Sequence, residues 1–60
     1  MNADDIKKLR HKLGLTQEQL AHKIGVAFTS ISRWENGRTK PSPLAQYALM
    51  RLKADLLNFK

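Results

Sequence analysis

The chain has 60 residues and a formal net charge of +6, from eleven Lys and Arg against five Asp and Glu. It contains no cysteine, which excludes disulfides and thiolate metal sites, and it has no apolar run near the roughly 20 residues that span a bilayer. Residues 1–60 are therefore expected to form one small domain, without a secretory signal, in the cytoplasm. The basic surplus favours a polyanionic partner.

The first predicted helix lies between Asn2 and Gly14. Asn2 is a favourable N-cap, two aspartates follow it in the first turn, and basic residues gather toward the end, which suits the helix dipole. Apolar residues recur at positions i, i+3 and i+7 and form one core stripe: Ile6, Leu9 and Leu13.

A second helix is predicted from Gln17 to Ile24. Thr16 can cap it, and Gln19, three residues later, can complete a capping box. Gly25 should end this helix, since glycine takes the left-handed conformation at little cost. Two apolar residues four positions apart share its inner face: Leu20 and Ile24.

The third helix is expected from about Phe28 to Asn36, after a tight turn that makes two short helices cross steeply. Ala27 stands at its N-cap position, and alanine cannot cap, which should cost about 1 kcal/mol relative to a good cap. The apolar face of this segment is formed by three residues: Val26, Ile31 and Trp34.

The fourth helix should run from Pro43 to about Leu57, with Ser42 as its cap and proline at the first helical position. An advance of about 100° per residue divides its apolar side chains into two arcs. The wider arc is the expected core face: Leu44, Ala45, Ala48, Leu49, Leu52, Leu56 and Phe59. The narrower arc is expected to remain outside the core: Tyr47, Met50, Ala54 and Leu57.

The segment from Leu15 to Gly37 reads L-T-Q-E-Q-L-A-H-K-I-G-V-A-F-T-S-I-S-R-W-E-N-G. It resembles the DNA-binding helix-turn-helix, and more narrowly the Cro/repressor-like (XRE) family. The resemblance implies an all-α, compact, four-helix lambda-repressor-like domain with its helix-turn-helix core at residues 16–37. It also implies a sequence-specific transcriptional regulator, such as a repressor, that binds double-stranded DNA.

Helical spacing turns four residues of the third helix away from its core face, and the resemblance implies that they contact bases: Phe28, Thr29, Ser32 and Arg33. Arg33 is the sharpest candidate, because a guanidinium can bind guanine O6 and N7 together. Phe28 replaces the polar residue often found there, and it could contact a thymine methyl group or fold back onto the core. The resemblance implies phosphate contacts from helix ends and a basic loop: Gln17, Asn36, Arg38 and Lys40.

The resemblance also implies an ion pair between Arg10 and Glu35, although both could instead be solvated surface charges. Family members usually bind DNA as two-fold dimers, so a homodimer is expected through the narrower arc of the fourth helix. The alternative is that these apolar side chains only cover the edge of the core.

Two other classes of function remain open from the sequence. The chain could be a protein-interaction module, such as an antitoxin or a complex subunit that retains the fold, and Phe28 in place of a polar residue favours this alternative. An enzyme is not expected, because the sequence has no nucleophile–base pair, metal cluster or phosphate-binding glycine loop. His11 and His22 are isolated, so no metal, cofactor or small-molecule effector site is expected.

Overall fold

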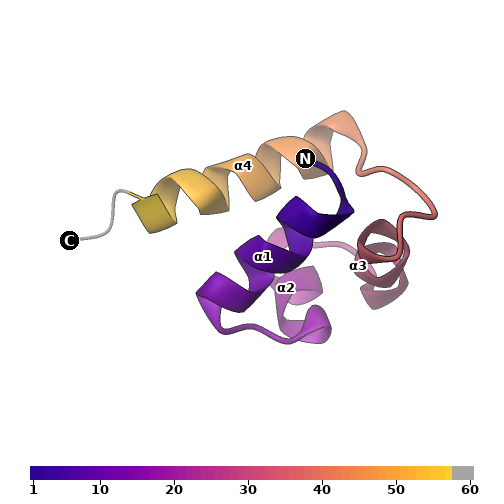
Figure 1. Ribbon diagram of the computed structural model, residues 1–60, viewed down its shortest axis with the longest axis horizontal. Helices are drawn as coiled ribbons and strands as arrows, with labels where there is room; N and C mark the ends of the chain where they lie inside the picture. The colour runs from indigo at the N-terminus through magenta and orange to yellow at the C-terminus, as the bar shows by residue number, and fades with distance from the viewer. Residues whose placement is uncertain (58–60) are drawn as a thin grey trace.

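The computed structural model describes residues 1–57, and this part of the chain forms four helices and no strand. They are α1 (Ala3–Leu13), α2 (Gln17–Ile24), α3 (Phe28–Glu35) and α4 (Pro43–Leu57), and α4 lies along one side of the other three (Figure 1). The expected all-α fold is confirmed. Among the described residues, no helix has both the length and the apolar character to cross a membrane.

Local hydrogen bonds explain where α1 and α2 begin. Asn2 Oδ1 accepts from the backbone N–H of Asp5 at 2.8 Å, and Asp5 Oδ2 accepts from that of Asn2 at 3.4 Å. Thr16 Oγ1 and the Gln19 backbone N–H are 3.1 Å apart, and Gln19 Oε1 accepts from the Thr16 backbone N–H at 2.8 Å. Two capping boxes therefore satisfy backbone donors that a helix start leaves free. The predicted box at Thr16 is confirmed.

The α2–α3 turn and the start of α4 also follow the local sequence. Gly25 has φ 75°, a left-handed conformation that suits glycine, and it ends α2 as predicted. Ser42 Oγ accepts from the backbone N–H of Ala45 at 3.2 Å and caps α4. By contrast, Ala27 makes no side-chain cap bond to α3. The third helix must therefore be held in place by its packing.

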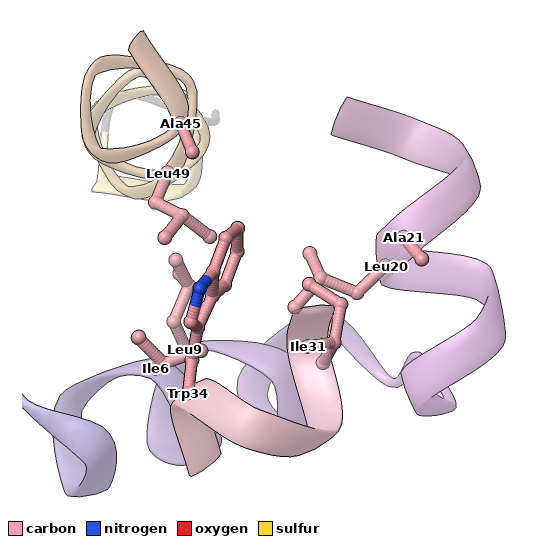
Figure 2. Close-up of a cluster of buried hydrophobic side chains, with 8 residues drawn as sticks. All are labelled: Ile6, Leu9, Leu20, Ala21, Ile31, Trp34, Ala45 and Leu49. Atoms are coloured by element: carbon pink, nitrogen blue, oxygen red, sulfur yellow. The ribbon is translucent and has the colours of Figure 1, made fainter. Parts of the chain in front are cut away.

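That packing is the core of the molecule, to which each helix contributes two buried side chains (Figure 2). The indole of Trp34 points from α3 toward Leu49 of α4, with Ile6 and Leu9 of α1 alongside. Trp34 thus joins three helices. The remaining members of the buried cluster are Leu20, Ala21, Ile31 and Ala45, and the partly buried residues packed against it include Leu13, Ile24, Val26, Leu52 and Leu56.

The expected core face of α4 was too wide. Leu44 is 79% exposed, whereas Ala45 is 7% exposed. Leu44 precedes Ala45 by one residue, and that step of about 100° turns its side chain out of the arc that faces the other helices. Ala48 is only half-buried. Phe59, which was placed on the same face, lies outside the described residues.

Candidate functional site

The outer face of α3 gathers the residues that were expected to contact bases. Ile31 and Trp34 are buried, and this leaves the opposite side of the helix free. One shallow depression on the surface is lined by Phe28, Thr29, Ser32, Arg33, Asn36 and Arg38. These six residues include two arginines and no carboxylate. The structure therefore brings all four candidate base-contacting residues together with two of the four candidate phosphate-contacting residues.

Phe28, at the first position of α3, is 47% exposed. It is not among the buried residues of the core cluster. The alternative in which it folds back onto the core is therefore wrong. The Phe28 ring lies at the surface, in the same depression as the two arginines.

A polar contact orders the other end of the same face. The side-chain amide of Asn36 donates from Nδ2 to Ser32 Oγ at 3.4 Å. Gly37 follows with φ 73°, and the backbone N–H of Arg38 donates to the Arg33 carbonyl at 2.9 Å. This turn places Arg38 beside α3, where it lines the same depression.

Lys40 lies elsewhere. It is exposed, but it lines a different depression, together with the start of α1 and with Trp34 and Gln46. Lys40 thus stands at the flank of the α3 surface rather than within it. A partner that reaches both Arg38 and Lys40 must extend past the end of α3 along the loop.

Arg10 and Glu35, whose pairing the resemblance implied, are in contact through a two-pronged ion pair and are not solvated surface charges. Arg10 Nε lies 2.7 Å from Glu35 Oε2, and Nη2 lies 2.9 Å from Oε1. The third guanidinium nitrogen, Nη1, donates to the Leu15 carbonyl at 3.0 Å. Only 1% of the Glu35 side chain and 13% of the Arg10 side chain are exposed. We call these two side chains, with the Leu15 carbonyl and Gln17, the Arg10 cluster.

The charge of Glu35 is retained in this buried position. Burial on its own raises the pKa of the Glu35 carboxyl, but hydrogen bonds from Arg10 and Gln17, with the Arg10 and Lys7 charges, outweigh it and hold the pKa below its ordinary value. The same hydrogen bond raises the pKa of the Arg10 guanidinium, despite some desolvation. Both groups are therefore ionised near neutral pH.

Gln17 has a contact that the sequence analysis missed. It is half-buried, and its Nε2 donates to Glu35 Oε1 at 3.1 Å. The amide expected to face a phosphate is thus also part of the Arg10 cluster. No signal in the sequence points to this contact, because no spacing rule connects residues 18 positions apart.

The narrower arc of α4 is exposed, as expected from the helical spacing. Tyr47 is 59%, Met50 55% and Leu57 72% exposed, and Ala54 is also exposed. Arg51 lies beside this arc, with Nη1 3.3 Å from the Tyr47 hydroxyl and its guanidinium carbon 5.9 Å from the ring centre. An apolar strip therefore runs along α4, outside the core.

Comparison with known proteins shows which family has a similar sequence. The family described as Helix-turn-helix matches residues 6–51, which include most of α1, all of α2 and α3, and the larger part of α4. An uncharacterized HTH-type transcriptional regulator of Methanothermobacter thermautotrophicus is 41% identical over 46 residues, covering 77% of this chain and 67% of that protein. One from Archaeoglobus fulgidus is 40% identical over 47 residues, covering 78% and 67%.

A larger protein contains a similar segment. The type II methyltransferase M1.ScrFI of Lactococcus lactis subsp. cremoris is 43% identical over 49 residues, which are 77% of this chain but only 13% of the methyltransferase. The chain thus spans about two thirds of the two regulators and a small fraction of the enzyme. No solved structure matches it significantly.

Proposed function

Because this chain belongs to the helix-turn-helix family, we propose that it is a sequence-specific DNA-binding regulator of transcription, of the XRE type. Two relatives named as transcriptional regulators correspond to it over most of its length, which supports this function. The match covers only 13% of the methyltransferase, which gives no reason to propose catalysis by this chain. We therefore propose that it acts by binding alone. Its place of action would be the nucleoid, in the cytoplasm.

The observation that carries the proposal is the basic depression on α3. It collects hydrogen-bonding groups, an aromatic ring and two arginines on one helix face and the loop after it. An α-helix fits the major groove of B-DNA, where base edges present distinct donors, acceptors and methyl groups. With α3 in the groove, Arg33 faces base edges, while Arg38 and Lys40 flank it at the level of the phosphates. Regulation follows from occupancy of a site that polymerase also needs.

Selection of bound duplexes from a random pool tests the function directly. A short consensus with two inverted halves is expected, since a two-fold dimer binds a palindromic site. The selected duplex should then bind at least about a thousand times more tightly than random duplex at physiological salt. Equal affinity for every duplex, or no binding even at low salt, would rule out a sequence-specific regulator.

Arg38→Ala and Lys40→Ala should each weaken binding to all duplexes alike. Each loss of a phosphate contact should reduce the slope of log affinity against log salt by about 1. The measurement is a salt titration with selected and random duplex. Lys8→Ala removes a comparable exposed charge from α1, and its slope should stay near that of the wild type. A change in preference at one base pair, with the slope unaltered, would contradict the assignment.

Arg33→Ala should relax the preference at a single G·C position and weaken binding to the selected site by about 1–3 kcal/mol. The reason is that alanine leaves guanine O6 and N7 without their paired donors. Thr29→Ala should matter less, because one hydroxyl can accept from or donate to several bases. The measurement is affinity for the selected site and its point variants. Full retention of the base preference by Arg33→Ala would show that another side chain reads this position.

A second candidate function rests on Phe28. An exposed ring at the start of α3 is also what a protein-interaction module would present to a protein partner. The two functions differ in their response to a single methyl group. If Phe28 contacts DNA, replacing one thymine of the selected site by deoxyuridine weakens the wild type but not Phe28→Ala. If no thymine responds and Phe28→Ala binds DNA as the wild type does, a protein partner is the better assignment.

We further propose that the chain binds its site as a homodimer through the narrower arc of α4. Three large side chains in this arc are more than half exposed, in a domain with a small core. A two-fold pairing of such strips would remove apolar surface from water in both copies. It would also allow two α3 helices to enter successive major grooves about 34 Å apart.

Met50→Glu and Leu57→Glu should prevent dimerisation, because each would bury a carboxylate without a partner. Sedimentation should show concentration-dependent association of the wild type, with loss of association and of site affinity in both variants and unchanged helicity. Leu44→Glu makes the same chemical change on α4 outside the arc, at a side chain that is 79% exposed, and should associate normally. Wild-type DNA binding by both arc variants would exclude this surface.

A further inference from the structure

The Arg10 cluster contains one half-buried side chain, Gln17, that contacts the interior and was expected to contact a phosphate. Gln17 is the first residue of α2, next to its cap Thr16. Its amide nitrogen carries two hydrogens, and the described contact to Glu35 Oε1 uses one of them. The second N–H and the amide oxygen are left for another partner. The orientation of this amide is therefore set from one side only.

The anchor for Gln17 is itself held firmly. Glu35 accepts two hydrogen bonds from Arg10 in addition to that from Gln17, and its side chain is almost fully buried. Arg10 is fixed in turn by the Leu15 carbonyl. Glu35 belongs to α3, whereas Gln17 belongs to α2. One hydrogen bond therefore links the start of α2 to the helix that carries the base-contacting residues.

The charges make this anchor compatible with a phosphate. An isolated carboxylate near the DNA backbone would repel it, but the guanidinium of Arg10 lies against both carboxylate oxygens. The pair has no net charge. Glu35 can thus orient a donor toward an anion without adding a negative charge to the interface.

We propose that Glu35 is a positioning residue that holds the Gln17 side chain, before DNA arrives, in the orientation from which its free N–H donates to a phosphate. This inference rests on the proposed DNA-binding function. A free glutamine side chain loses rotamer freedom when it is immobilised in a complex, and that loss weakens binding. With Gln17 already fixed by Glu35, this loss occurs on folding, and the affinity for DNA is correspondingly higher.

A purely structural role for the contact predicts something different. In that case Gln17 only donates a hydrogen bond to an oxygen of a buried carboxylate. Removing the Gln17 side chain would then lower the stability of the fold without a specific effect on the affinity for DNA. Two double variants separate the two roles. Both lack the ion pair, but only one of them keeps a hydrogen-bond acceptor at position 35. Arg10→Met/Glu35→Gln keeps an acceptor oxygen and is called the acceptor background; Arg10→Met/Glu35→Leu has none and is called the apolar background.

The test compares six proteins: the wild type and the two backgrounds, each with and without Gln17→Ala. The affinity of each for the selected duplex is measured at a temperature where circular dichroism shows all of them folded. Gln17→Ala should weaken binding roughly two- to tenfold more in the wild type and in the acceptor background than in the apolar background, which is the range expected for one immobilised side chain. Lys40→Ala, a charge outside the cluster, serves as the control and should weaken binding equally in all three.

An equal effect of Gln17→Ala in all backgrounds would overturn the positioning role. Failure of the wild type to bind any duplex would instead refute the proposed function, so the two failures are distinct. A measurement on the wild type needs no variant to fold. The NMR order parameter of the Gln17 side-chain amide should already be high in the free protein and should change little on binding DNA. An amide that is mobile in the free protein and ordered only with DNA would contradict the proposal.

Discussion

Trp34→Ala should lower the free energy of unfolding by about 3–5 kcal/mol. The indole of α3 is 7% exposed and lies beside buried side chains of α1 and α4, so alanine would leave a cavity where these three helices meet. Small domains have total stabilities of only about 5 kcal/mol or little more, and most of that reserve would be lost. Urea unfolding followed by circular dichroism measures the change.

Tyr47→Ala is the matched control for this prediction. It removes an aromatic side chain of similar size from α4, but that side chain is 59% exposed in the monomer. At a protein concentration too low for dimers, its effect should stay within about 0.5 kcal/mol. A Trp34→Ala variant that unfolds at nearly the same urea concentration as the wild type would show that the indole does not join the three helices.

Arg10→Ala should be the second severe substitution, at about 3 kcal/mol or more. It would leave the Glu35 carboxylate, which is 1% exposed, with Gln17 as its one remaining side-chain donor among the described residues. Removing one partner of a buried ion pair costs more than removing both, because the other charge stays buried and uncompensated. The double variant Arg10→Met/Glu35→Leu should therefore lose much less unfolding free energy than Arg10→Met and Glu35→Leu lose in sum. Strict additivity of the unfolding free energies would show that the residues do not interact.

The same pair predicts how stability depends on pH. The pKa of Glu35 in the folded protein lies below its ordinary value of about 4.5, so the unfolded chain binds this proton more readily than the folded one. The stabilisation from ionised Glu35 is complete above the ordinary pKa and is lost as the pH falls through the lower, folded pKa. Arg10 stays charged throughout this range. Urea unfolding from about pH 7 down to about pH 3 should show the loss in the wild type and a smaller loss in Arg10→Met/Glu35→Leu.

The helix ends were predictable because their causes are local. The Thr16 box, the left-handed Gly25 and the Ser42 cap each depend on residues within about one turn of one another, and the structure places all three as expected. The core stripes of α1 and α3 were predictable for a similar reason, since helical spacing alone selects Ile31 and Trp34. The resemblance to a known family supplied the remaining assignments.

The errors have a different origin. The exposure of Leu44 depends on how α4 is rotated against three other helices, and a helix with two apolar arcs does not specify that angle by itself. The contact from Gln17 to Glu35 joins residues 18 positions apart, and no spacing rule connects them. Both features are set by tertiary packing. They could be found only once the helices were placed relative to one another.

Because Ala27 provides no cap, the two ends of α3 are not held equally firmly. Its last turn is fixed by the buried indole of Trp34 and by the ion pair of Glu35, whereas its first turn has no side-chain cap and begins with a half-exposed Phe28. Local opening in proteins begins where buried contacts are few, so fraying should be confined to the residues ahead of the fully buried Ile31. In the proposed complex, Phe28 and Thr29 would thus be able to adjust to the shape of a groove, while Ile31, Trp34 and Glu35 keep the helix aligned with the body of the protein.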